Sequence, residues 1–148
     1  MHVVVVEANR VVELTLRTAI EAQGCTVQSA GRLADVVGGL NSCMPSFFLI
    51  DRELPDGDGL SLVRALRAAG FEGGILVLSG REETRARMEG LRAGADDYVL
   101  NPFHVPELLQ RMDNICRRRC VRPTRIALEL RPGPAADEDE GPTERISA

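Results

Sequence analysis

Hydrophobic residues along the chain follow two alternating patterns. Val3 to Val6 form a run of four valines, and Phe47 to Asp51 and Gly74 to Ser79 are similarly apolar, which is typical of strands buried on both faces. Between these runs, apolar residues recur every three or four positions, as between residues 10 and 23. This is the spacing of an amphipathic helix, so the pattern predicts strands that alternate with helices.

Five strand-helix units fit the pattern. Strands are predicted at His2–Glu7, Cys25–Ser29, Phe47–Asp51, Gly74–Ser79 and Asp97–Leu100, and helices near residues 10–23, 32–42, 58–69, 82–93 and 105–119. Gly24 is the expected C-cap of the first helix. Such alternation favours an α/β fold, a doubly wound five-stranded parallel sheet with helices on both faces.

The composition changes after residue 119. Four prolines, at positions 123, 132, 134 and 142, punctuate the rest of the chain, and residues 137–140 are consecutive acids. We therefore expect residues 1–120 to form one domain and residues 121–148 to be a disordered, proline-rich acidic tail or linker. Within it, Arg125 to Leu130 could form a short strand.

Charge and composition narrow the class of protein. The net charge is −4, and all 18 basic residues are arginine, so bulk affinity for nucleic acid is not expected. The four cysteines lack metal-site spacing, and no apolar run has the length of a membrane span or signal sequence. We predict a cytoplasmic protein with reduced thiols and no membrane contact.

Polar residues with suitable chemistry stand where four of the strands end. Glu7, Asp51 and Ser79 end the first, third and fourth predicted strands, and Asn101 follows the fifth. In a doubly wound sheet these positions meet at one rim. There, paired carboxylates can hold magnesium while one of them attacks phosphorus. A hydroxyl group and a cation would hold the transferred phosphoryl oxygens.

The motifs around these residues resemble those of response-regulator receiver domains, specifically the receivers of winged-helix (OmpR/PhoB-type) transcriptional regulators. The matching segments are residues 3–7 (VVVVE), 49–59 (LIDRELPDGDG), 78–80 (LSG), 94–103 (GADDYVLNPF) and 107–109 (ELL). They occur in the family's order and approximate spacing over residues 2–119. The resemblance implies a flavodoxin-like receiver fold with strand order 2-1-3-4-5.

The same resemblance assigns roles to individual residues. Asp51 would accept phosphate from a histidine kinase, and Glu7 would help to hold magnesium. Ser79 would be the hydroxyl group that turns toward the phosphoryl group, and Tyr98 the aromatic switch residue that reports it. Pro102 would follow a cis peptide bond.

Two positions depart from the family pattern. Ala8 stands where the family has a second carboxylate that ligates the metal, and Asn101 stands in place of the phosphate-binding lysine. Each loss could cost a few kcal/mol of transition-state stabilisation, on the order of a hundredfold in rate. The resemblance therefore implies weak or absent magnesium binding and slow, weak or absent phosphorylation of Asp51.

Three residues near Asp51 are candidates for compensation. Arg52 and Arg81 could bind phosphate through their guanidinium groups, although such arginines more often face solvent. Glu53 could occupy the mouth of the pocket and supply, or compete for, a metal contact.

The resemblance also implies a homodimer through the fourth helix, the fifth strand and the last helix. The charged residues expected on this face are Arg87, Asp96, Asp97, Glu107, Arg111 and Arg118. A two-fold interface would pair Arg87 with Glu107 and Asp97 with Arg111 across the two copies. By composition alone, these residues would be ordinary solvated charges.

Three functions remain open on the sequence alone. The leading hypothesis is a degenerate receiver, not a turnover enzyme, that controls transcription through dimerisation and reaches DNA only through a domain not present in this chain. The first alternative is a conventional phosphorelay receiver that a histidine kinase phosphorylates at Asp51. The second alternative is a ligand-sensing or protein-interaction module without phosphotransfer.

Overall fold

The structure is a computed structural model of the chain, and it describes residues 1–39 and 45–119. The strands are β1 (His2–Val6), β2 (Thr26–Ala30), β3 (Phe47–Asp51), β4 (Glu53–Leu54), β5 (Gly57–Asp58), β6 (Gly74–Ser79) and β7 (Asp97–Leu100). The helices are α1 (Arg10–Glu21), α2 (Leu33–Gly39), α3 (Gly59–Ala68), α4 (Thr84–Ala93) and α5 (Val105–Arg119). Apart from the short β4 and β5, strands and helices alternate along the described chain, as the hydrophobic pattern predicts.

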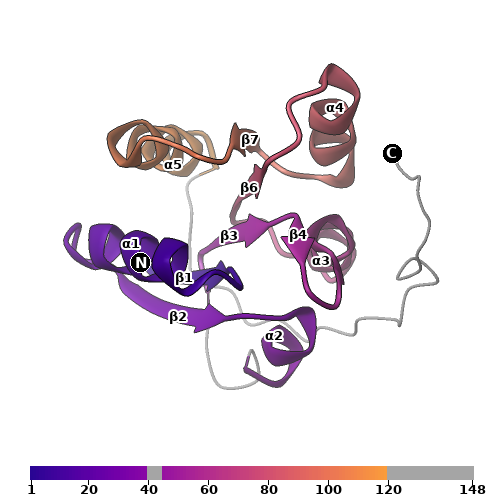
Figure 1. Cartoon of the computed structure of the whole chain (residues 1–148). Coiled ribbons are helices and arrows are strands. Elements are labelled where there is room, and N and C mark those ends of the chain that lie inside the picture. The colour runs from indigo at the N-terminus through magenta and orange to yellow at the C-terminus, as the bar shows by residue number, and fades with distance from the viewer. Residues whose placement is uncertain (40–44, 120–148) are drawn as a thin grey trace.

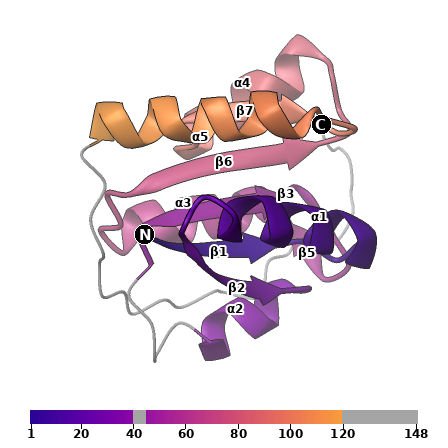
Figure 2. The ribbon, with the colours of Figure 1, turned by 90° about the vertical axis from the view of Figure 1, so that its left-hand side faces the viewer.

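The five longer strands form one parallel sheet in the order β2-β1-β3-β6-β7. With the small β4-β5 hairpin set apart, this is the order 2-1-3-4-5, so the predicted fold is confirmed. Helices cover both faces (Figures 1 and 2): α1 and α5 lie on one side, and α2, α3 and α4 on the other.

Each face of the sheet has its own hydrophobic core because successive side chains of a strand point to opposite faces. Val3 and Val5 pack with Leu16 of α1 and Leu108 of α5. On the other face, the cluster is built on Val4, Val6, Phe48 and Ile50 and includes residues of α2, α3 and α4. The valine run of β1 is buried on both sides, which fixes it as a central strand.

The structure corrects several predicted boundaries. The first helix ends at Glu21 with Ala22 as its C-cap, and Gly24 instead takes a positive φ of 89° two residues later. The second strand begins and ends one residue later than predicted, and α2 is described only to Gly39. The β4-β5 hairpin was not predicted, because two-residue strands around Pro55 and Asp56 look like a loop in the sequence.

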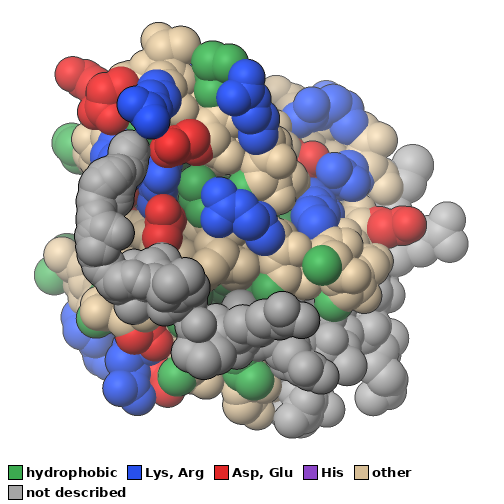
Figure 3. Space-filling view, turned by 90° about the vertical axis from the view of Figure 1, so that its right-hand side faces the viewer, with side chains coloured by type: hydrophobic (Ala, Val, Ile, Leu, Met, Phe, Trp, Pro, Cys, Tyr) green, Lys and Arg blue, Asp and Glu red, His purple; other side chains and the backbone are tan. Residues whose placement is uncertain are grey.

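The predicted tail, including the short strand proposed at Arg125 to Leu130, lies outside the described residues. Among the residues that are described, no helix is both long and apolar enough to cross a membrane. The face formed by α3 and α4 carries more basic than acidic side chains (Figure 3). All of the basic ones are arginines, since the chain has no lysine.

Candidate functional site

The parallel register brings the predicted residues to one rim of the sheet. Val6 pairs with Ile50, so that Glu7 and Asp51 come next on neighbouring strands. Asp51 is in register with Leu78, and the next residue, Ser79, with Leu100. The carboxyl ends of β1, β3, β6 and β7 therefore gather Glu7, Asp51, Ser79 and Asn101, as the sequence predicts.

Asp51 is buried beside a second carboxyl group. Burial raises the pKa of Asp51 to about 8, and hydrogen bonding and charge repulsion from Glu7 act in the same direction. Glu7 Oε2 accepts the backbone N–H of Asn9 at 3.1 Å, whereas its buried Oε1 has no hydrogen-bond partner among the described residues. Burial and the neighbouring Glu7 both favour the protonated form of Asp51.

The donor set fits a magnesium ion only in part. Glu7 and Asp51 offer two carboxylates, while Ala8 offers no side-chain oxygen. Within residues 1–39 and 45–119, no group of three or more His, Cys, Asp or Glu side chains could hold a metal ion. Magnesium prefers six oxygen ligands, and several of them are commonly water.

Glu53 reaches over the rim from the unpredicted hairpin. It pairs with Asp58 in the β4-β5 register, and its backbone N–H donates to Asp51 Oδ1 at 3.0 Å. Its carboxylate accepts the Ser79 hydroxyl at 2.8 Å and the Gly80 N–H at 3.0 Å. The Arg81 Nε atom lies 3.7 Å from Glu53 Oε2, so Arg81 meets this carboxylate at the pocket mouth.

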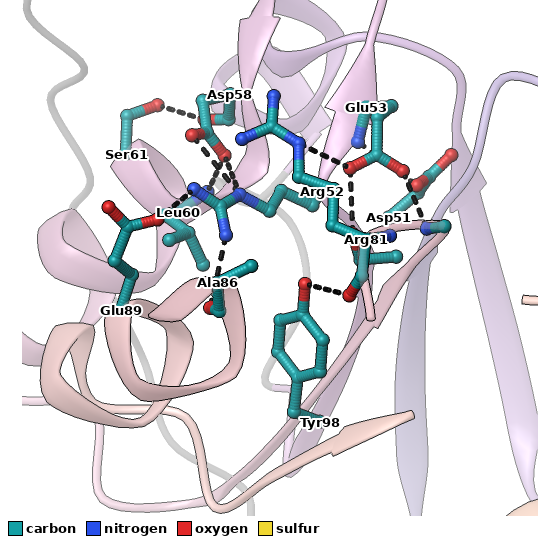
Figure 4. Close-up of polar contacts among 12 residues, drawn as sticks. Asp51, Arg52, Glu53, Asp58, Leu60, Ser61, Arg81, Ala86, Glu89 and Tyr98 are labelled. Atoms are coloured by element: carbon teal, nitrogen blue, oxygen red, sulfur yellow. Dashed lines mark hydrogen bonds and ion pairs between the residues drawn. The ribbon is translucent and has the colours of Figure 1, made fainter. Parts of the chain in front are cut away.

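Both expectations for Arg52 are wrong, because its side chain faces neither the phosphoryl site nor solvent. Its side chain is only 4% exposed and points away from Asp51 (Figure 4). It bonds to Glu89 at 2.8 Å, to the Ala86 carbonyl at 3.1 Å and to Asp58 at 3.3 Å. These contacts tie the end of β3 to α4 and to the start of α3, so Arg52 is not available to compensate for the missing lysine.

Tyr98 is turned into the protein. Its side chain is fully buried, and its hydroxyl group donates to the Arg81 carbonyl at 3.0 Å (Figure 4). The Arg87 guanidinium lies 5.5 Å from the ring centroid and donates to the Tyr98 carbonyl at 3.2 Å. Gly90 of α4 leaves the room that the ring needs, because a Cβ atom there would lie 2.7 Å from Tyr98 Cδ2.

Asn101 follows β7 and forms a cis peptide bond with Pro102, as predicted. Its backbone N–H donates to the Ser79 carbonyl at 2.9 Å. The backbone thus places residue 101 beside Ser79, where the family has its lysine, but the amide of Asn101 brings no positive charge. Arg81, which contacts Glu53, supplies a basic side chain at the pocket mouth.

The model of the response regulator receiver domain family matches residues 3–113 of the chain. The chain belongs to this family. Receivers are signalling modules and not turnover enzymes, and they generally bind Mg²⁺ at the phosphorylation site.

Curated relatives of this receiver are transcriptional regulators. Over 118 residues it is 41% identical to the virulence transcriptional regulatory protein PhoP of Shigella flexneri and 38% identical to that of Salmonella typhimurium. The match covers 80% of this chain and 53% of each relative. The chain therefore spans about half the length of the curated relatives that it matches.

Solved structures show the same fold. The receiver domain of the TMAO respiratory system response regulator TorR is 35% identical, with a TM-score of 0.74 over 80% of this chain and 98% of that one. The receiver domain of the Francisella response regulator 1452 is 27% identical, with a TM-score of 0.73 over 79% of this chain and 97% of that one.

Most of the predicted dimer-face residues of this receiver lie together on one surface. Arg111 binds Asp97 at 2.8 Å and Glu107 at 3.0 Å. These residues and Arg118 line a shallow surface depression of about 790 Å³ along α5. The pairing of Arg87 with Glu107 and of Asp97 with Arg111 across two copies stays a prediction.

Asp96, which is also predicted on the dimer face, is largely covered by contacts within the chain, and its part in a dimer stays a prediction. Its side chain is only 11% exposed, and it contacts Arg67 at 3.1 Å and Arg119 at 2.6 Å. It also accepts the Ile75 N–H at 2.9 Å. Asp96 therefore joins α3, β6 and α5 inside the chain, and a partner copy would find little of it exposed. Sequence position alone could not separate it from Asp97, which is the next residue.

Proposed function

We propose that this receiver is an atypical one, in which phosphorylation of Asp51 is slow, weak or absent. Its output arrangement, by which we mean Ser79 directed at the rim and Tyr98 turned inward, forms without phosphate. The observation that carries the proposal is the buried Tyr98, whose hydroxyl group bonds to the Arg81 carbonyl while Arg87 packs over the ring. In the receiver family, Tyr98 matches the switch residue that turns when the phosphoryl group is bound. Here the ring is turned inward and is held there by contacts with the chain's own residues.

The chemistry of the rim supports slow phosphorylation. A carboxylate attacks phosphorus only in its ionised form, whereas the pKa of Asp51 is raised to about 8 by burial and by Glu7. Ala8 removes a metal ligand, so magnesium binding is weak or absent in this proposal. Asn101 removes the cation, and Arg52 does not replace it because its guanidinium is bound to Glu89 and Asp58.

Output would come from a homodimer that controls transcription. The surface of α4, β7 and α5 carries Arg87, Asp97, Glu107, Arg111 and Arg118, and their mixed charges suit a two-fold self-complementary contact. The matched receiver segment makes up 53% of each curated relative, and those relatives are transcriptional regulators, so we propose that DNA is reached through a further domain. We place the protein in the cytoplasm, where a histidine kinase could meet it.

A conventional receiver is the second candidate, and one observation favours it. Asp51 is retained at the end of β3, and its Oδ1 is oriented by the Glu53 N–H at 3.0 Å. A solved response regulator from Burkholderia pseudomallei, 25% identical to this chain, carries a phosphorylated aspartate.

Intact-mass spectrometry after incubation with acetyl phosphate and magnesium separates the two candidates. The proposal predicts little or no phosphoryl adduct on the wild-type protein, because Ala8 removes a metal ligand and Asn101 removes the cation. Asp51→Asn is the matched control that defines background acetylation and phosphorylation at other sites. An adduct on most of the wild-type molecules that disappears in Asp51→Asn would establish the conventional receiver.

A further inference from the structure

Ser79 and Gly80 offer two hydrogen-bond donors that point to the same place at the rim. The Ser79 hydroxyl and the Gly80 N–H lie at the carboxyl end of β6, beside Asp51, which is in register with Leu78. A hydroxyl group and a backbone N–H directed at one position form a small oxyanion site. A phosphoryl group on Asp51 would present its oxygens to these donors.

In this chain the two donors already hold an anion. Glu53 Oε2 accepts the Ser79 hydroxyl at 2.8 Å, and Glu53 Oε1 accepts the Gly80 N–H at 3.0 Å. The carboxylate thus uses both oxygens on both donors, and Arg81 adds a positive charge 3.7 Å away. The β4-β5 hairpin aims the side chain, since Glu53, two residues after Asp51, pairs with Asp58.

We propose that the Glu53 carboxylate is an internal ligand of this oxyanion site, where it takes the place of a phosphoryl group and holds Ser79 and Tyr98 in the output arrangement. This inference rests on the proposed function, and it names the group that makes the arrangement independent of phosphate. Glu53 is a positioning residue in this account.

A continuous set of hydrogen bonds leads from Glu53 to the switch residue. The Ser79 hydroxyl that donates to Glu53 also accepts the backbone N–H of Arg81 at 3.0 Å. The carbonyl of the same residue, Arg81, accepts the Tyr98 hydroxyl at 3.0 Å. The orientation of Ser79 therefore sets the position of the loop after β6, and that loop provides the acceptor that keeps Tyr98 inside.

The same carboxylate opposes phosphorylation of Asp51. A phosphoryl group on Asp51 would need the Ser79 and Gly80 donors, so it would have to displace Glu53. Glu53 thus both substitutes for the phosphoryl group and occupies its place.

Tyr98 provides a direct measure of this arrangement because the chain contains one tyrosine and no tryptophan. Its fluorescence, quenched by iodide, reports how accessible the ring is. We would compare the full-length wild type with Glu53→Ala and Glu53→Gln. Glu82→Ala is the matched control, since Glu82 is an exposed glutamate of the loop between β6 and α4. Thermal melts would confirm that each variant is folded.

Glu53→Ala is expected to raise the iodide quenching constant severalfold, because Ser79 loses its acceptor and the loop no longer holds Tyr98. Glu53→Gln is expected to lie between Glu53→Ala and the wild type, and Glu82→Ala to match the wild type. Inorganic phosphate, added at constant ionic strength, should restore the low quenching of Glu53→Ala by filling the vacated site. Chloride at the same ionic strength should not.

The possible failures are distinguishable. Unchanged quenching in Glu53→Ala would overturn this inference and leave the proposed function standing, provided that Tyr98 is shielded in the wild type. A rise that phosphate does not reverse would also overturn it, since Glu53 would then be structural and no oxyanion site would be involved. A Tyr98 that is fully accessible in the untreated wild type would contradict the proposed function itself.

Discussion

At the scale of single residues, the site combines an intact acceptor with altered surroundings. Asp51 and Ser79 stand where strand-end reasoning puts them, because the position of a residue after a parallel strand is readable from the hydrophobic runs. The environment of Asp51 is harder to predict from the sequence. Its raised pKa depends on burial and on the distance to Glu7, and neither follows from spacing along the chain.

The raised pKa of Asp51 predicts a pH-dependent effect of Asp51→Asn on stability. The pKa moves from 3.8 to about 8 on folding, so the native state keeps a proton that the unfolded state releases. That contribution is fully present below pH 3.8 and is lost as the pH rises through about 8. Asparagine mimics the protonated form and avoids this loss.

The unfolding free energy of Asp51→Asn minus that of the wild type should therefore increase by about 2–4 kcal/mol when the pH is raised from 5 to 8.5. Urea unfolding at both pH values measures the gain. Asp35→Asn, at an exposed carboxylate of α2, is the control and should show little change between the two pH values. A gain for Asp51→Asn that does not depend on pH would show that Asp51 is ionised normally in the folded protein.

At the scale of elements, Arg52 connects three parts of the fold. It follows β3, and it binds Glu89 and the Ala86 carbonyl of α4 together with Asp58 at the start of α3. Burial disfavours its charge, but Asp58, Glu89 and Tyr98 outweigh that effect and raise the pKa of Arg52. The side chain therefore stays charged and holds α4 beside the rim.

Arg52→Ala should lower the unfolding free energy by about 2–3 kcal/mol, since it removes the buried hydrogen bonds that join β3 to α4 and α3, although Glu89 and Asp58 can still turn toward water. Urea denaturation measures this loss. The matched control is Arg64→Ala on α3, an exposed arginine whose removal should change stability by less than about 0.5 kcal/mol. Equal effects of the two substitutions would rule out the connecting role of Arg52.

The elements themselves could largely be predicted from sequence, and the exceptions have physical reasons. Runs such as Phe47 to Asp51 are long and apolar enough to identify a buried strand. The β4-β5 hairpin is two residues long on each side, which is too short for a periodic signal. The contact between Glu53 and Ser79 depends on this hairpin, so the sequence does not predict it. Arg52 was misplaced because its partners Glu89 and Asp58 are distant in sequence and meet it only in the folded chain.

At the scale of the whole molecule, the receiver spans about half the length of its curated relatives. We propose that it acts through the surface of α4, β7 and α5, where Arg111 contacts both Asp97 and Glu107. These are exposed or half-exposed charges, and individually they contribute little to the stability of one chain. Their effect should appear when two copies meet, since exchange of partners across a two-fold axis repeats every contact.

The most direct test of the central claim is the solution mass of the full chain, measured by light scattering before and after treatment with acetyl phosphate and magnesium. The account predicts the same dimer in both samples, because Glu53 and Tyr98 already hold the output arrangement. Arg111→Glu should be monomeric in both, and Arg32→Glu, at an exposed arginine near α2, should remain dimeric. A wild-type monomer that dimerises only after phosphorylation would contradict the account.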